Sequence, residues 1–70
     1  MTSVIKQHTN NNYYISLEIK MRNERIIYEV QVCPLYSENM CGYPIREISY
    51  PMNEKKKALA TFNRYKRKYV

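Results

Sequence analysis

The chain has 70 residues, 44% of them hydrophobic, and a formal net charge of +6. This hydrophobic content is too high for a disordered chain, and the length allows one small domain with a single thin core. Because the sequence contains neither the roughly 20-residue apolar run of a membrane-spanning helix nor the apolar segment of a secretory signal, we expect a cytoplasmic protein without a membrane partner.

The first twelve residues are predicted to form a flexible N-terminal arm, because they end in the polar cluster HTNNN. The remaining residues, 13–70, are expected to form one domain. Within this domain, the segment YYISLEIKM at residues 13–21 alternates between an apolar face and a more polar face. The segment IIYEVQVC at residues 26–33 repeats the alternation. A period of two over this length is typical of half-buried β-strands, so both segments are predicted strands.

The short segment RNER between the two strands predicts a hairpin with a well-specified register. Pairing about Asn23 and Glu24 places apolar residues opposite each other at four positions: Met21 and Ile26, Ile19 and Tyr28, Leu17 and Val30, and Ile15 and Val32. A slip of one residue would bring the wrong faces together. Because Asn-Glu lacks the glycine of the preferred two-residue turn, a wider loop is an open alternative.

A longer connection and a third strand follow the hairpin. Pro34 is predicted to end the second strand, and Gly42, the one glycine of the chain, is predicted to adopt a positive φ. Residues 43–51 are predicted to form an edge strand, because Pro44 and Pro51 suit such a position.

A helix is predicted to complete the chain. Asn53 is a suitable N-cap for a helix that runs from Glu54 nearly to the C-terminus. The predicted fold is therefore α+β: a three-stranded antiparallel meander sheet with one C-terminal helix packed on one face, in the order βββα.

The predicted helix has an apolar side and a basic side. At about 100° per residue, five residues fall within one apolar arc that would pack on the sheet: Ala58, Leu59, Phe62, Tyr65 and Tyr69. Five cations fall on the opposite side, and we call them the basic stripe: Lys56, Lys57, Arg64, Arg67 and Lys68. This stripe would be roughly 18 Å long at about 1.5 Å per residue.

A row of cations is compatible with an ordinary solvated helix face, but two features favour a docking surface. Residues 54–70 hold seven of the twelve basic residues and one carboxylate, Glu54, so the stripe itself contains no acidic partner. In addition, Lys55, Lys56 and Lys57 occupy the first turn, where the helix dipole makes each cation unfavourable by about 0.3–1 kcal/mol. We therefore favour docking on a polyanion, with nucleic acid as the preferred partner.

The segment YPMNEKKKALATFNRY, together with the predicted topology, resembles the strand-to-helix junction of the arm-type DNA-binding domains of tyrosine recombinases. The resemblance implies DNA binding through a sheet inserted into the major groove. The outward sheet residues depart from this use, because Glu18 would lie opposite Glu29 where a groove-reading sheet needs Arg or Lys. If nucleic acid binds, we expect the basic stripe to make the phosphate contacts.

The sequence argues against an enzyme. The one histidine, His8, lies in the predicted arm, aspartate is absent, and a single glycine does not suffice for a phosphate-cradling loop. A structural zinc site needs four Cys or His ligands, whereas the chain has three such residues. We predict no catalytic residue, no metal site and no cofactor, and we expect Cys33 and Cys41 to remain free thiols in a reducing compartment.

A second interpretation is a phage or mobile-element accessory protein, for example an inhibitor, that acts by binding another protein. The abundance of Ile, Asn, Lys and Tyr matches AT-rich codons, which suit such an origin. The contacts would come from the open sheet face and the loop at residues 34–42, since exposed tyrosines are favoured at interfaces. The candidate protein-contact residues are Tyr14, Glu18, Glu29, Tyr36 and Tyr43. The partner would then be an acidic protein surface, and a homodimer is possible under either interpretation.

Overall fold

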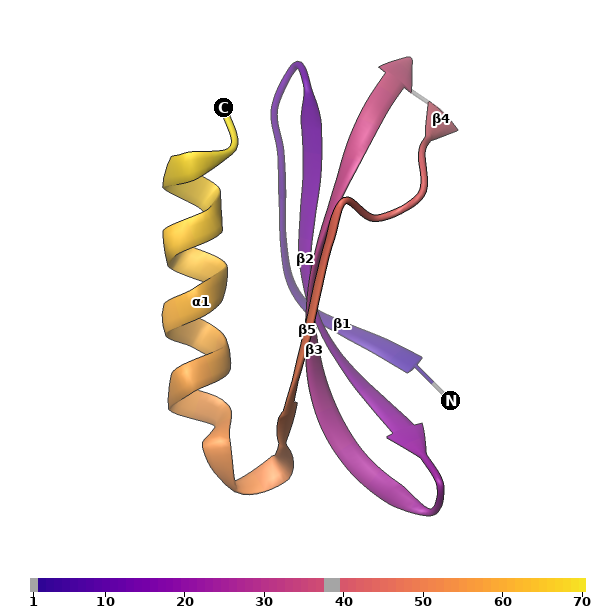
Figure 1. Ribbon diagram of the computed structural model, residues 1–70, viewed down its shortest axis with the longest axis vertical. Helices are drawn as coiled ribbons and strands as arrows, with labels where there is room; N and C mark the ends of the chain where they lie inside the picture. Colours follow the sequence, from indigo (N-terminus) through magenta and orange to yellow (C-terminus); the bar gives the residue numbers. More distant parts are fainter. Residues whose placement is uncertain (1, 38–39) are drawn as a thin grey trace.

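Residues 2–37 and 40–70, which the computed structural model of the chain describes, form a five-stranded antiparallel sheet and one C-terminal helix (Figure 1). The predicted α+β class is confirmed, with more strands than the predicted three-stranded meander. The elements are β1 (Thr2–Thr9), β2 (Tyr13–Arg22), β3 (Arg25–Ser37), β4 (Met40–Cys41), β5 (Arg46–Pro51), the 3-10 turn η1 (Met52–Glu54) and the helix α1 (Lys55–Lys68).

The sheet is arranged around the long strand β3. β1 pairs with β2 and β2 pairs with β3, while β4 and β5 both pair with the other side of β3. β4 occupies the C-terminal end of β3, whereas β5 lies along residues 27–32. β3, which is thirteen residues long, thus pairs with three neighbouring strands.

The prediction of a flexible N-terminal arm is wrong, because Thr2–Thr9 forms β1 and pairs antiparallel with β2. The polar cluster that suggested a loose arm is the turn between these strands. Oδ1 of Asn10 accepts hydrogen bonds from the backbone N–H groups of Asn12 and Tyr13, both at 2.8 Å. The side chains of β1 are almost all exposed, so the strand is held by backbone pairing and leaves a weak apolar signal in the sequence.

The predicted register of the central hairpin is confirmed. All four apolar pairs occur as predicted, and Glu18 lies opposite Glu29. The turn contains two residues, Asn23 and Glu24, with φ angles of 52° and 62°. Positive φ at both central residues is what a type I′ turn requires, and its twist matches that of the strands. The tight turn therefore forms without glycine, and the wider loop does not occur.

Two predictions about the segment after the hairpin are wrong. Pro34 does not end β3, because the strand continues to Ser37. The carbonyl of Pro34 accepts a hydrogen bond of 2.8 Å from the N–H of Gly42. The N–H that proline lacks is not needed, because it would fall just outside the short β4 ladder. Gly42 does not adopt a positive φ. A Cβ at this position would lie 2.7 Å from Cε2 of Tyr36 and 3.0 Å from Cγ of Pro34, so glycine is required by close approach.

β5 is shorter than the predicted strand at residues 43–51. It begins at Arg46, after a loop in which the N–H of Ile45 donates to the carbonyl of Val32 at 2.8 Å. In the described sheet β5 pairs with β3 alone, so it is an edge strand as predicted, and it ends at Pro51.

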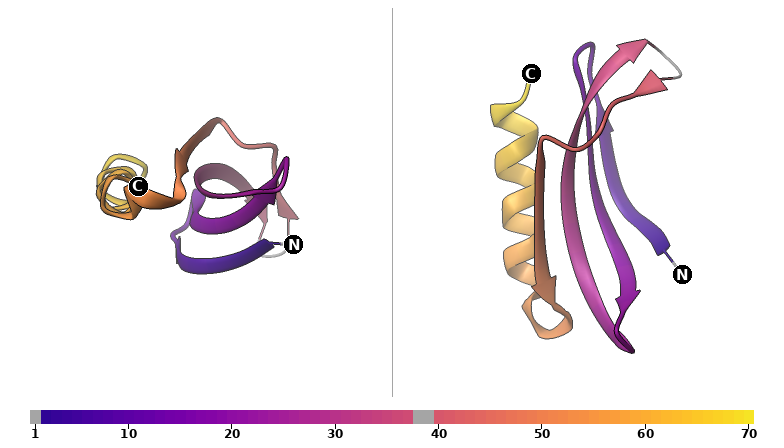
Figure 2. Two further views of the ribbon diagram at one scale, coloured as in Figure 1. Left: turned by 90° about the horizontal axis from the view of Figure 1, so that it is seen from below. Right: turned by 45° about the vertical axis from the view of Figure 1, so that its right-hand side comes forward.

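The helix covers one face of the sheet, and the hydrophobic core lies between the two layers (Figure 2). The buried core consists of residues from β2, β3 and α1: Ile15, Leu17, Tyr28, Val30, Val32, Ala58 and Phe62. The other members of the predicted apolar arc, Leu59, Tyr65 and Tyr69, pack against this core. The hairpin turn between β2 and β3 curves away from the helix (Figure 1), which leaves Met21 60% exposed although it continues the apolar face.

We predict that Leu17→Ala lowers the free energy of unfolding by about 2–5 kcal/mol, because a fully buried side chain is replaced by a cavity. This loss is comparable to the whole net stability of a domain of this size, which rarely exceeds roughly 3–5 kcal/mol. Met21→Ala is the matched control on the same strand and face, and it should cost about 0.5 kcal/mol or less. Urea denaturation followed by circular dichroism measures both; equal losses would contradict the assigned core.

Candidate functional site

All five cations of the basic stripe on α1 are exposed. The rotation of the helix is set by its opposite side, where Ala58, Thr61 and Phe62 are buried. Oγ1 of Thr61 forms a hydrogen bond of 2.5 Å with the hydroxyl of Tyr50 on β5. Apolar packing and this bond together fix the direction in which the stripe points.

The stripe has one acidic neighbour that was not predicted. Nζ of Lys57 lies 3.2 Å from Oε1 of Glu54, three residues earlier in the chain. Both side chains reach solvent, and such a pair contributes little to stability. Over residues 2–37 and 40–70, no ion pair involves the other four cations of the stripe. Most of its charge is therefore available to an external anion.

Aromatic rings support two of the cations. Cζ of Arg64 lies 5.5 Å from the ring centre of Tyr65, and Nζ of Lys68 lies 5.5 Å from that of Tyr69. The Tyr69 ring in turn makes edge contacts with the rings of Tyr13 and Tyr65, at centroid distances of 5.4 and 5.6 Å. A cation over a ring face is attracted by the ring quadrupole and keeps its charge. These contacts restrict the two side chains without neutralising them.

The helix begins without the predicted side-chain cap. Asn53 lies in η1, and Glu54, which occupies the N-cap position of α1, makes no capping hydrogen bond through its side chain. The 3-10 turn shifts the start of the helix past Asn53, which explains why this prediction is wrong. The first turn contains no acidic residue, whereas the last turn contains Lys66, Arg67 and Lys68. Cations are favourable at this C-terminal end and unfavourable at the N-terminal end.

The structure adds Arg46 to the surface beside the stripe. Nε of Arg46, at the start of β5, donates a hydrogen bond of 3.0 Å to the hydroxyl of Tyr69. The same end of the helix is held by Asn10, whose Nδ2 donates to the carbonyl of Tyr69 at 2.8 Å. The positive surface therefore continues from α1 onto the edge of the sheet. No local sequence signal predicts this, because the contact joins residues that are far apart in the chain.

The sheet face opposite the helix holds a charged network around Glu29, whose side chain is 1% exposed. Nζ of Lys20 lies 2.6 Å from Oε1 of Glu29, and Nη2 of Arg22 lies 3.3 Å from Oε2. Gln31 and Ser49 also donate hydrogen bonds to this carboxylate. The side chains of these neighbours enclose Glu29. It therefore stabilises the fold and is not accessible to a partner.

The network lowers the pKa of Glu29 from its ordinary value of 4.5. Burial by itself raises the pKa, but the hydrogen bonds from Lys20 and Gln31 and the positive charge of Lys20 outweigh it. The hydrogen bond to Glu29 likewise raises the pKa of Lys20 above 10.5. The ionised pair therefore stabilises the folded state across neutral pH.

The residues predicted to contact a protein are not gathered in one place. Tyr14 and Glu18 are half-buried, and Glu29 is buried. Tyr36 and Tyr43 are 71% and 93% exposed, and they lie around a hollow beside β4. The complete lining of this hollow is Tyr36, Met40, Cys41, Gly42, Tyr43 and Pro44. Glu38 and Asn39, within the predicted contact loop at 34–42, lie outside the described residues.

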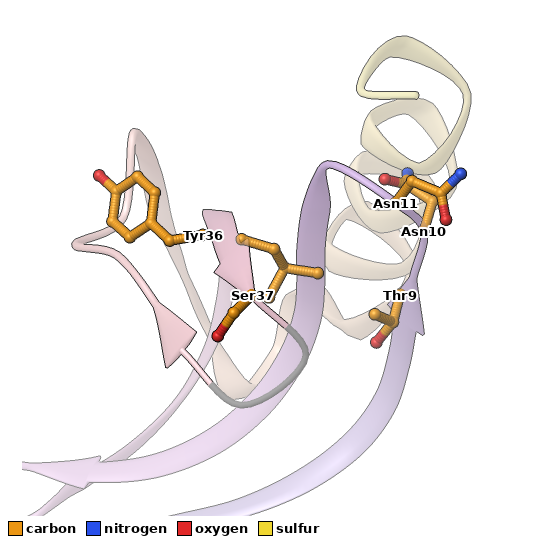
Figure 3. A pocket seen from close by; sticks show the side chains of 6 residues that line it. Thr9, Asn10, Asn11, Tyr36 and Ser37 are labelled. Carbon is orange, nitrogen blue, oxygen red and sulfur yellow. The ribbon is translucent and has the colours of Figure 1, made fainter.

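A pocket of about 310 Å³ lies between the β1–β2 turn and the C-terminal end of β3 (Figure 3). Thr9, Asn10 and Asn11 lie on one side of it, with Tyr36 and Ser37 on the other. Its lining contains no charged side chain that would serve acid–base chemistry. In the part of the chain that the structure describes, no group of three or more His, Cys, Asp or Glu side chains is placed to hold a metal ion.

No helix among the described residues combines the length and the apolar character needed to cross a membrane. No known protein family matches the chain, and no curated protein or solved structure shows significant similarity to it.

We predict that the protein loses stability as the pH falls through the lowered pKa of Glu29, below 4.5. A carboxyl group with a lowered pKa in the folded state contributes stability above its unfolded pKa and loses that contribution on protonation. Glu29→Gln should therefore flatten the pH dependence between about pH 5 and pH 3, and should lower the free energy of unfolding at neutral pH by about 1–3 kcal/mol.

The control for this prediction is Glu24→Gln, which makes the same change of charge in the exposed hairpin turn. Urea midpoints measured across the acid range should show the wild-type slope for this control. An acid slope in Glu29→Gln that equals that of the wild type would contradict the role of the network.

Proposed function

We propose that the protein is a non-catalytic nucleic-acid binder and that the basic stripe of α1 contacts the phosphate backbone. One observation carries this proposal: four of the five exposed stripe cations have no ion-pair partner within the described residues, and all five share one helix face. A row of Lys and Arg side chains neutralises phosphates and releases their counterions, which drives binding to a polyanion.

The N-terminal turn of the helix supports the proposal. Lys55, Lys56 and Lys57 stand at the positive end of the helix dipole, where each is unfavourable by about 0.3–1 kcal/mol. Among the described contacts, Glu54 offsets this unfavourable interaction with the helix dipole for Lys57 alone. A placement such as that of Lys55 and Lys56, which opposes local stability without compensation, is typical of residues kept for binding.

The proposed interaction has limited sequence specificity. Contacts from Lys and Arg to phosphates position a protein on nucleic acid but do not read the bases. The sheet face opposite the helix offers no basic reading surface, because its centre is Glu29 with its internal partners. We therefore expect affinity to depend on the charge and shape of the nucleic acid more than on its sequence.

The exposed aromatic residues favour a second candidate function, the binding of another protein. Tyr36, Met40 and Tyr43 are 71%, 60% and 93% exposed and line the hollow beside β4. Aromatic residues and methionine are enriched at interface cores. In this case Tyr36→Ala with Tyr43→Ala would abolish binding, whereas charge reversals in the stripe would leave it unchanged. A phage or mobile-element inhibitor would be of this kind.

We predict that the affinity for labelled single- and double-stranded DNA and RNA falls with salt with a log–log slope of about −3 to −5, as expected for a stripe of five cations that touches several phosphates. Reversing two stripe charges, Lys56→Glu with Arg67→Glu, should reduce the affinity at least about tenfold and the slope by about 2. Fluorescence anisotropy over a salt series measures both.

The matched control is Lys6→Glu with Arg25→Glu, which changes the net charge equally but lies on β1 and at the hairpin turn. This control should lose much less affinity than the stripe variant. Equal losses would assign binding to net charge and not to the stripe, and the absence of binding at low salt would contradict the proposal itself.

The single variant Lys56→Glu is predicted to have opposite effects on stability and binding. An acidic residue in the first turn interacts favourably with the helix dipole, so the free energy of unfolding should rise by about 0.3–1 kcal/mol. Affinity for nucleic acid should fall, since a phosphate contact is replaced by repulsion. Denaturant midpoints and anisotropy on the same preparation test this; a parallel loss of both properties would indicate that Lys56 acts through the fold.

A further inference from the structure

Cys33 and Cys41 form a pair of thiols that the proposed function does not use. Cys33, on β3, is 7% exposed, whereas Cys41, at the end of β4, is exposed, and both are free. β3 and β4 pair antiparallel with Cys41 opposite Leu35, so Cys41 lies diagonally across from Cys33 on the same face of the sheet. The two thiols are close enough for Cys41 to affect the pKa of Cys33.

Backbone contacts hold this arrangement in place. The residue after Cys41 is anchored, because the N–H of Gly42 donates to the carbonyl of Pro34 at 2.8 Å. Gly42 also allows the ring of Tyr36 to approach its backbone, where a Cβ would be too close. The strand that carries Cys41 is therefore held against the strand that carries Cys33.

We propose that Cys33 and Cys41 are a reversible oxidation site, at which a hydroperoxide converts the two thiols into an intramolecular disulfide. In the first step the Cys41 thiolate attacks the peroxide oxygen, the O–O bond breaks, and the products are Cys41 sulfenic acid and, after protonation, an alcohol or water. In the second step the sulfur of Cys33 displaces the sulfenic hydroxyl group, which leaves as water with the thiol proton. The two thiols lose two electrons and two protons, and the hydroperoxide is reduced.

The two cysteines have different environments, and these assign their roles. Cys41 is exposed and meets the oxidant first. Burial, followed by the neighbouring Cys41 and the charges of Glu18 and Glu47, raises the pKa of Cys33 to about 11, so it stays protonated and unreactive towards the oxidant. Cys33 is the thiol diagonally across from a sulfenic acid at Cys41, and this position assigns it as the resolving thiol.

The disulfide would fasten β4 to β3 next to the exposed rings of Tyr36 and Tyr43. The disulfide would therefore restrict the movement of the residues around the hollow beside β4, and it would leave the basic stripe on α1 unaffected. The proposal does not rest on nucleic-acid binding, and affinity for nucleic acid should be the same in the reduced and oxidised protein.

The test is peroxide treatment of the reduced, desalted full-length protein, followed by digestion after glutamate under denaturing, non-reducing conditions. Glu38 lies between the two cysteines in the sequence, so cleavage separates them unless a disulfide joins them. We expect a linked pair of peptides that is two hydrogens lighter than its parts, arises from monomeric protein and disappears on reduction. Thiols that stay free, or links that form only between molecules, would overturn the proposal.

Single variants test the assigned order. In Cys33→Ala, oxidation should stop at a sulfenic acid on Cys41 that dimedone traps, and in Cys41→Ala the buried Cys33 should remain largely unoxidised over the same time. Oxidation of Cys41→Ala as fast as the wild type would overturn the assignment of Cys41 as the first thiol. The peptide mapping uses the wild-type protein, so it decides the proposal even if Cys33→Ala does not fold.

Discussion

The apolar layer between the β2–β3 hairpin and α1 is the constraint on which the rest of the structure depends. Leu17 and Val30, opposite each other in the hairpin, are fully buried, and Phe62 closes the layer from the helix side. Neither element would persist alone, since an isolated hairpin is marginal in water and so is a helix of this length with three lysines in its first turn. Because Ala58 and Phe62 face inward, the stripe cations, which lie at other angles around the helix, are exposed to solvent. The basic stripe is thus a consequence of the core.

The sequence predicted the parts of the fold in which side chains alternate with a clear period. The hairpin register follows from period two, and the faces of α1 follow from the helical period, so both are confirmed. β1 has no such pattern, because an edge strand with exposed side chains is stabilised by backbone pairing. The turn at Asn23 and Glu24 and the continuation of β3 past Pro34 depend on backbone geometry that residue type alone does not determine.

The candidate surfaces were predictable to the extent that they lie on one element. The positions of the stripe cations follow from helical geometry, and their exposure in the structure agrees with it. The contact between Arg46 and Tyr69 was not predictable, because it joins distant residues across the helix–sheet boundary. Glu29 shows most clearly how far exposure can be predicted from the sequence. The alternation of side chains places it on an open face of the sheet, but the long side chains of its neighbours bury it.

Binding through the basic stripe is tested most directly by titrating isotopically labelled protein with a short nucleic-acid duplex at low salt and following the amide chemical shifts. If the stripe is the binding surface, shift changes should cluster at Lys56, Arg64 and Arg67, reverse on addition of salt, and leave the hairpin turn at Asn23 unaffected. Shift changes centred on Tyr36 and Tyr43, with α1 unchanged, would contradict the account and favour the aromatic hollow as the site of interaction.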